Sequence, residues 1–289
     1  MKALLHELRL SLIALQFLTR VPVPGWVGFE PAWLQGCLRY FPLVGALVGL
    51  AGALVLAATA FWWPPVVAVV LSMAFTVWLT GGFHEDGLAD TCDGLGGAVS
   101  RERALTIMKD SRLGSYGALG LILMLILKAT VLASLATPLL NELDSAESSH
   151  VRQVLLAWTM MALVWCHAAS RLVPVCLIRF LPYAGDLDHA KAKPLAMQVS
   201  WLNLLGAVMM TGAVAGLMWL WFGFTAWPAG TLLAALMKST LAMALGAAFC
   251  ARWFSKRLGG FTGDTLGASQ QITEVLGLMA WLAVVHPVA

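Results

Sequence analysis

The sequence has little charge. Lys, Arg, Asp and Glu together make up 11% of its 289 residues, whereas an ordinary soluble domain has about 25%. This scarcity excludes a water-soluble globule, and the hydrophobic content of 60% excludes a disordered chain. The formal net charge of +3 is too small to indicate a nucleic-acid partner.

Cysteine is also sparse, and its positions form no pattern. Four of the five cysteines lie at or inside apolar runs, namely Cys37, Cys166, Cys176 and Cys250. The spacing matches neither a metal site nor a disulfide framework, so we interpret these residues as small buried hydrophobes.

Long apolar runs are what the sequence has instead, and each can cross a hydrocarbon core of about 30 Å. They predict an all-α fold, a polytopic transmembrane bundle that forms a single integral-membrane domain over residues 1–289. A helix in the first twenty residues separates its charged side chains from its leucines, so we expect it to lie at the membrane interface. The seven predicted spans lie near residues 37–61, 65–82, 117–140, 153–179, 199–223, 229–251 and 266–285.

The charged loops predict the orientation of these spans. Residues 141–152 contain three acids and one arginine, whereas the alternate loops contain clusters of Lys and Arg near 101–112, 191–193 and 252–257. By the positive-inside rule, the basic loops are cytoplasmic.

The second span leads directly into an acidic stretch, residues 79–97. If this stretch is helical, Asp86, Asp90 and Asp93 project within about 60° of one another, because they follow the i, i+4, i+7 spacing. Carboxylates at such short separations repel one another unless a cation neutralises their charge. This number of hard oxygen ligands suits Mg²⁺ that is bound together with a substrate diphosphate. A solvated acidic loop is the alternative.

His84 lies just before this cluster. It could act as a base, or it could be a polar residue at the boundary of the span.

A glycine-rich stretch, residues 256–268, opens the last span on the same side. Its glycines let backbone N–H groups approach phosphate oxygens, and Asp264 could complete a metal site with the first cluster. The alternative is an ordinary helix start capped by Asp264 or Thr265. The phosphate-binding residues that we predict here are Gly260, Thr262, Gly263 and Thr265.

Two further groups could bind phosphate. Lys109, Ser111 and Arg112 precede the third span, where Arg112 could clamp a phosphate or snorkel at the interface. Inside the fourth span, Arg171 needs a polar partner, so it is either a ligand-binding residue or half of a structural pair with a carbonyl or an acid. Lys128 and Lys238 face the same requirement.

Taken together, these motifs resemble the cobalamin synthase, or adenosylcobinamide-GDP ribazoletransferase, family. The resemblance covers nearly the whole chain and is carried by FLTRVPVP (17–24), FPLVGALVG (41–49), TGGFHEDGLADTCDG (80–94), MKDSRLGSYG (108–117), the pair Ser170 and Arg171, and LGGFTGDTLGA (258–268). The position between His84 and Asp86 is acidic here, which leaves the role of Glu85 undefined.

The resemblance implies a reaction and its participants. Adenosylcobinamide-GDP and alpha-ribazole, or its 5'-phosphate, would give adenosylcobalamin, or its 5'-phosphate, with release of GMP and a requirement for Mg²⁺. Asp86, Asp90, Asp93 and Asp264 would hold the metal, and His84 or one carboxylate would take the proton. The site would lie on the cytoplasmic face of the bacterial inner membrane. Besides membrane lipid, the partners we expect are a second copy of the chain or other enzymes of the pathway.

Two other classes of protein fit part of the pattern. Membrane prenyltransferases and alcohol phosphotransferases also combine aspartate-rich helices with Mg²⁺ and diphosphates, although their motifs have different spacings. A corrinoid or metal transporter would place its polar residues near the membrane midplane between repeated halves. In this chain the acids cluster at the predicted cytoplasmic edge, and we find no repeat.

Overall fold

The computed structural model describes residues 2–137, 145–185, 198–222 and 229–285. Over these residues the secondary structure is helical, apart from one isolated β-bridge between Tyr183 and Phe261. The predicted all-α class is therefore confirmed.

Most of the long helices follow the predicted apolar runs, but one helix begins at Ser145, inside the stretch 141–152 that was predicted as a loop. In chain order they are α1 (Lys2–Leu18), α2 (Trp33–Cys37), α3 (Phe41–Thr59), α4 (Pro65–Thr80), α5 (Phe83–Gly96), α6 (Arg101–Met108), α7 (Ser115–Ala136), α8 (Ser145–Phe180), α9 (Trp201–Phe222), α10 (Ala229–Leu258) and α11 (Gly263–Val285). Two short 3₁₀ turns, Gly25–Val27 and Leu38–Tyr40, flank α2.

Six of the described helices are long and apolar enough to cross a membrane, and a seventh crossing results if the bent pair of α4 and α5 counts as one span. The polytopic bundle predicted from the sequence is thus confirmed. The sixth predicted span ends at residue 251, but α10 continues to Leu258 because no helix breaker occurs before Gly259, whose φ is +78°. The loop containing Lys191 and Lys193 lies outside the described residues.

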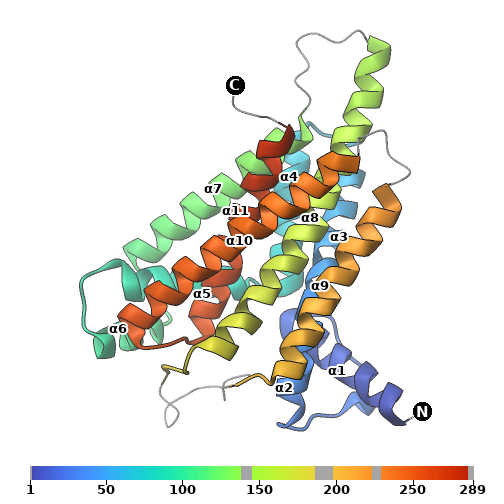
Figure 1. Cartoon of the computed structure of the whole chain (residues 1–289). Helices are drawn as coiled ribbons and strands as arrows, with labels where there is room; N and C mark the ends of the chain where they lie inside the picture. Colours follow the sequence, from blue (N-terminus) through green and yellow to red (C-terminus); the bar gives the residue numbers. More distant parts are fainter. Residues whose placement is uncertain (1, 138–144, 186–197, 223–228, 286–289) are drawn as a thin grey trace.

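Helix α8 forms the centre of the bundle. In the most apolar 18-residue stretch of α8, 83% of the residues are buried. The corresponding stretch is 22% buried in α7 and 28% buried in both α9 and α10. Figure 1 shows α8 running among α3, α9, α10 and α11. The outer helices present leucine, methionine and tryptophan side chains outward, as membrane helices do where they meet lipid.

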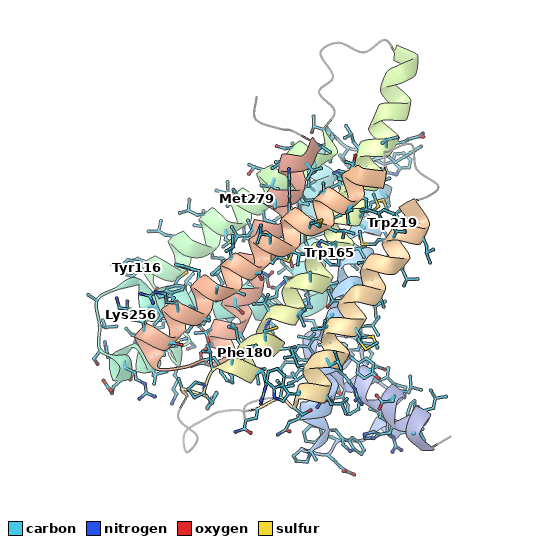
Figure 2. The ribbon with its side chains drawn as sticks, in the orientation of Figure 1. Tyr116, Trp165, Phe180, Trp219, Lys256 and Met279 are labelled. Atoms are coloured by element: carbon cyan, nitrogen blue, oxygen red, sulfur yellow. The ribbon has the colours of Figure 1, made fainter. Side chains whose placement is uncertain are left out.

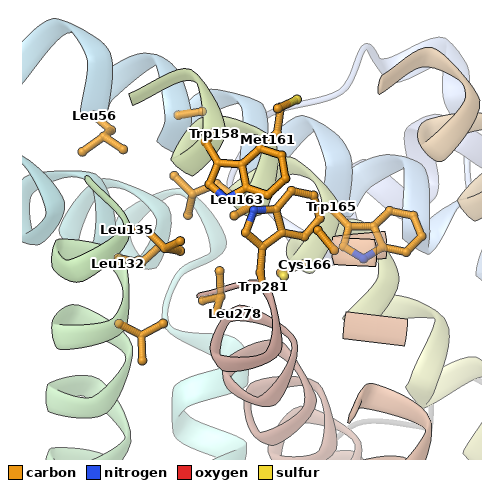
Figure 3. Close-up of a cluster of buried hydrophobic side chains, with 14 of the residues drawn as sticks. Leu56, Leu132, Leu135, Trp158, Met161, Leu163, Trp165, Cys166, Leu278 and Trp281 are labelled. Atoms are coloured by element: carbon orange, nitrogen blue, oxygen red, sulfur yellow. The ribbon is translucent and has the colours of Figure 1, made fainter. Parts of the chain in front are cut away.

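A hydrophobic cluster fills one part of the bundle, between α3, α7, α8 and α11 (Figure 3). At its centre Trp158 of α8 packs on Trp281 of α11, with ring centroids 4.9 Å apart. Both indoles are fully buried, and Leu132 and Leu135 of α7 lie beside them. These contacts hold α11 against the central helix.

Helix α1 lies at the opposite end of the bundle from the C-terminal end of α11 (Figure 1). It buries Leu10, Ile13 and Leu18 in a second cluster that includes residues of α2 and α3, while Leu4 and Leu8 remain exposed. The predicted N-terminal helix is therefore present, with an apolar edge available for lipid. Its position at the interface stays a prediction.

Candidate active site at the junction of α5 and α11

The acidic helix begins at a sharp turn. Gly81 and Gly82, between α4 and α5, have φ values of +74° and +71°. This is a left-handed backbone conformation that residues other than glycine rarely adopt. The two helices therefore meet at 89°. Helix α5 thus leaves α4 at nearly a right angle instead of continuing along its axis.

The acidic stretch is helical, as the spacing of its aspartates requires. Helix α5 covers Phe83–Gly96 although it contains three glycines, and the N–H of Asp86 donates to the carbonyl of Gly82 at 2.8 Å. Acidic residues in the first turn favour this helix start. Asp86, Asp90 and Asp93 consequently share one face.

Helix α11 brings the fourth aspartate to this face. A Cβ on Gly87 would lie 2.8 Å from the carbonyl oxygen of Asp264, and one on Gly267 would lie 3.3 Å from the backbone of His84. At Gly87 only glycine permits this close approach of the two helices, and at Gly267 a Cβ would fit only if its neighbour shifted slightly. The structure thus joins the two motifs that the sequence placed at the same side of the membrane.

The clustering of carboxylates changes the titration of Asp90. Burial, followed by the negative charges of Asp264, Asp86 and Asp93, raises the pKa of Asp90 from 3.8 to about 7. Burial and three negative charges act on Asp90 together, and a bound cation would relieve this accumulation of negative charge.

The donor set fits a hard divalent cation. Among the described residues, no three His, Cys, Asp or Glu side chains converge closely enough to form a complete protein metal site. Mg²⁺ commonly takes only one or two carboxylates and fills its remaining positions with water and substrate phosphate. Asp86, Asp90 and Asp264 could therefore supply one or two ligands to such a metal, with water and phosphate oxygens filling the other positions.

Asp93 has a separate structural contact. Its two carboxylate oxygens accept hydrogen bonds from the N–H groups of Gly114 and Gly117, each at 2.7 Å. These N–H groups belong to the first turn of α7, which has no intrahelical acceptors for them. Asp93 thus caps α7 from a neighbouring helix, a contact that its position in the sequence did not suggest.

His84 lies in the first turn of α5 with only 4% of its surface exposed. Burial, followed by the positive charge of Arg171, holds the pKa of His84 well below 6.5. The imidazole is therefore neutral at physiological pH, the form in which it can accept a proton.

The loop before α7 is exposed. Arg112, with 87% of its side chain exposed, forms a bidentate ion pair with Asp110 at 2.5–3.1 Å. The hydrogen bonds from Arg112 lower the pKa of Asp110 to about 2. Lys109 and Ser111 are exposed on the same loop. In Figure 2, Tyr116 at the start of α7 and Lys256 near the end of α10 lie toward the same end of the bundle.

The glycine-rich stretch begins α11 with a capping arrangement. The N–H of Thr262 donates to the Thr265 hydroxyl at 2.8 Å, and the N–H of Thr265 donates to the Thr262 hydroxyl at 3.3 Å. Both threonines are buried, whereas Gly263 is exposed. Gly260 packs against the carbonyl of Pro182 beside the β-bridge. The structure shows a helix cap here, but the residue in the N-cap position is Thr262 and not Asp264 or Thr265, because the Thr262 hydroxyl accepts from the N–H of Thr265.

Arg171 points into the protein interior. It is 2% exposed, donates to the carbonyl of His167 at 2.9 Å, and lies 3.9 Å from a carboxylate oxygen of Glu274. The structural pair considered for this arginine is therefore present. Lys128 likewise forms an ion pair with Glu274, whereas Lys238 is exposed on α10.

Sequence reasoning missed the polar residues of α11. Gln270, Gln271 and Glu274 are almost completely buried, and each has a polar partner on another helix or within α11. Their presence inside an otherwise apolar span was the available signal, because polar residues within a membrane are costly unless they are partnered.

Comparisons with known proteins cover nearly the entire chain. Residues 10–282 match the family described as cobalamin-5-phosphate synthase. A protein named adenosylcobinamide-GDP ribazoletransferase from Leptothrix cholodnii is 56% identical, and the alignment covers 98% of both chains. A protein of the same name from Shewanella piezotolerans is 43% identical, and the alignment covers 96% of both chains. Another from Polaromonas naphthalenivorans is 42% identical, with 94% of this chain and 96% of the relative covered. No solved structure matches the chain.

Proposed function

The chain belongs to the cobalamin-5-phosphate synthase family, and we propose that it catalyses the reaction for which its relatives are named, the transfer of a ribazole to adenosylcobinamide-GDP. A ribose hydroxyl of alpha-ribazole, or of its 5'-phosphate, attacks the phosphorus joined to the aminopropanol arm of cobinamide. The bond from this phosphorus to the bridging oxygen breaks, and GMP leaves. The hydroxyl proton passes to a base.

One observation supports this chemistry above the others. Helices α5 and α11 meet through Gly87 and place Asp264 against the face that carries Asp86 and Asp90. We assign these three carboxylates to Mg²⁺, while Asp93 adds negative charge and keeps its contacts with α7. When bound, Mg²⁺ would neutralise charge on the diphosphate and on the departing GMP.

The remaining groups supply binding and proton transfer. The exposed side chains of Lys109, Ser111 and Arg112 can reach phosphate oxygens from the loop before α7. The exposed N-terminus of α11 at Gly263 offers backbone N–H groups to an anion, supported by the favourable end of the helix dipole. Neutral His84 is the base that we favour, since it lies in the first turn of α5, two residues before Asp86, and its lowered pKa leaves the ring unprotonated.

The setting is part of the proposal. We place the site on the cytoplasmic face of a bacterial inner membrane, following the distribution of basic loops. The expected homo-oligomer or complex with pathway enzymes remains a prediction. We retain neither the prenyltransferase and alcohol phosphotransferase alternatives nor the transporter, because the family match extends over residues 10–282.

The test uses purified protein in lipid nanodiscs, supplied with adenosylcobinamide-GDP and alpha-ribazole with and without Mg²⁺. We expect metal-dependent release of GMP, matched one for one by the corrinoid product measured by mass spectrometry. Asp90→Asn should lower turnover at least roughly 100-fold, since it removes a carboxylate that stabilises the metal–diphosphate complex.

The matched control is Glu30→Gln, which neutralises an exposed acid on the loop before α2. It should leave turnover unchanged. If folded Asp90→Asn protein kept both its turnover and its dependence on Mg²⁺, the metal assignment would be wrong. If the unmodified protein bound adenosylcobinamide-GDP but formed no product, the reaction itself would be in question.

A further inference from the structure

A hydrogen-bonded chain of side chains connects the acidic helix to the interior of the bundle. The side-chain amide of Gln271 donates to a carboxylate oxygen of Glu85 at 2.9 Å and to the side-chain oxygen Oε1 of Gln270 at 3.1 Å. The amide of Gln270 donates in turn to the hydroxyl of Ser170 at 2.9 Å and to Glu274 at 2.6 Å. The chain thus runs from α5 through α11 to α8.

The inner end of this chain is firmly held. Glu274 is fully buried and pairs with Lys128 of α7, and its other oxygen lies 3.1 Å from the imidazole of His167 on α8. Arg171 adds a second cation 3.9 Å away. An ion pair surrounded by apolar helices is difficult to break, because its separated charges would have no solvent.

The outer end lies on the face of α11 that contacts α5. Asp264, Gly267 and Gln271 are separated by three and four residues, so they project from α11 in nearly the same direction. Asp264 adjoins Gly87, Gly267 adjoins His84, and Gln271 bonds to Glu85. The hydrogen bond between the side chains of Gln271 and Glu85 thus joins α11 to α5 at an interface where the two backbones also approach closely.

Glu85 is also set apart from the neighbouring aspartates by its environment. One of its oxygens is occupied by Gln271, and the other is buried without a hydrogen-bond partner. Its side chain is therefore directed into the contact with α11, while Asp86, the next residue, is exposed. This arrangement explains how an acid can stand beside the proposed metal ligands without joining them.

We propose that Glu85 and Gln271 are positioning residues for the transfer reaction. Their hydrogen bond fixes the N-terminal turn of α5 against α11 and so sets the placement of Asp86 and Asp90 relative to Asp264. The inference rests on the proposed function for its kinetic consequence, whereas the mechanical link between the helices stands independently of the reaction.

The test compares Glu85→Ala, Gln271→Ala and the double variant in nanodiscs. Each single variant should lower kcat by roughly 10- to 100-fold, since misplacement of reacting groups by about 1 Å has effects of this size. KM for adenosylcobinamide-GDP should change less than about threefold, because substrate-binding groups are retained. The double variant should be no worse than either single variant, because both remove the same hydrogen bond.

Hydrogen–deuterium exchange provides a readout that needs no turnover. Amides of residues 83–90 should exchange faster in both single variants than in the unmodified protein, while those of α9 and α10 should not change. The matched control is Ser239→Ala, which removes a buried bond from the Trp165 indole between α8 and α10 at 2.8 Å. It should leave exchange in α5 unchanged.

Glu85→Gln separates the hydrogen bond from the charge, because its amide oxygen still accepts from Gln271. It should retain activity and protected α5 amides. Loss of activity in Glu85→Gln with α5 still protected would overturn the proposal in favour of direct participation of the carboxylate. Unchanged exchange in Glu85→Ala would also overturn it. If the unmodified protein showed no turnover, the proposed function would fail while the exchange measurement still decided this inference.

Discussion

Asp90 shows how strongly a single carboxyl group depends on its neighbours. Its pKa is raised to about 7 by burial and by the charges of Asp264, Asp86 and Asp93. The ordinary value is 3.8, so between these two pH values the folded protein holds a proton that the unfolded chain has released. The resulting contribution to stability is complete below pH 3.8 and is lost as the pH rises to about 7.

The same proton would compete with the proposed Mg²⁺. We expect the affinity for Mg²⁺ to increase by about tenfold between pH 6 and pH 8, because Asp90 must ionise before it can bind. Isothermal titration calorimetry of the purified protein in nanodiscs measures this directly. Asp90→Asn should remove most of the pH dependence, and a constant affinity across this range in the unmodified protein would contradict the prediction.

How far the sequence predicts these residues depends on whether their partners are local. The shared face of Asp86, Asp90 and Asp93 follows from helical spacing alone, and the helix confirms it. The contacts of Asp93 with the start of α7, and of Arg171 with His167 and Glu274, depend on how distant segments pack. Spacing carries no information about such neighbours.

Among the helices, α5 is held by other elements at both of its ends. Its N-terminal turn rests on α11, and Asp93 near its C-terminal end caps α7. The guanidinium of Arg257, at the end of α10, donates to the carbonyls of Leu95 and Gly97 at 2.9 and 2.7 Å. The short acidic helix therefore depends on tertiary contacts for its stability.

Removing the cap tests the role of Asp93. We expect Asp93→Ala to lower the free energy of unfolding by about 1–3 kcal/mol, because two N–H groups at the start of α7 lose a charged acceptor. Thermal unfolding in nanodiscs, followed by circular dichroism, measures the loss. The affinity for Mg²⁺ should change less than in Asp90→Asn. Equal loss of metal affinity in the two variants would instead make Asp93 a ligand.

The spans were the easiest elements to predict, because an apolar run of sufficient length specifies a membrane helix. The long central helix α8 and the outer helices read alike in the sequence, yet α8 is mostly buried and α9 and α10 are not. Burial inside a bundle depends on which helices surround a span. Helix α6 was not predicted at all, since its eight residues carry little apolar pattern.

Across the whole molecule, Glu274 connects three helices. Two cations, Lys128 and Arg171, and the imidazole of His167 surround its carboxylate in the interior. We expect Glu274→Gln to destabilise the protein by about 3–5 kcal/mol, because the cations lose their counter-charge while remaining buried. Thermal unfolding and the yield of folded protein measure the effect.

A double variant provides the control for this prediction. Combining Glu274→Gln with Lys128→Met removes one charge of each sign and should recover part of the lost stability. A single variant as stable as the unmodified protein would show that the buried ion pairs contribute little. The comparison needs no enzymatic activity, so it is independent of the proposed reaction.

The position of Glu274 on the last helix has a consequence for biosynthesis. Lys128 and Arg171 are translated and enter the membrane well before α11 leaves the ribosome. Until then, neither cation can meet its carboxylate, and the acidic helix lacks the surface against which it packs. The charge balance of the bundle and the assembly of its site are therefore completed by the same late event, the insertion of α11.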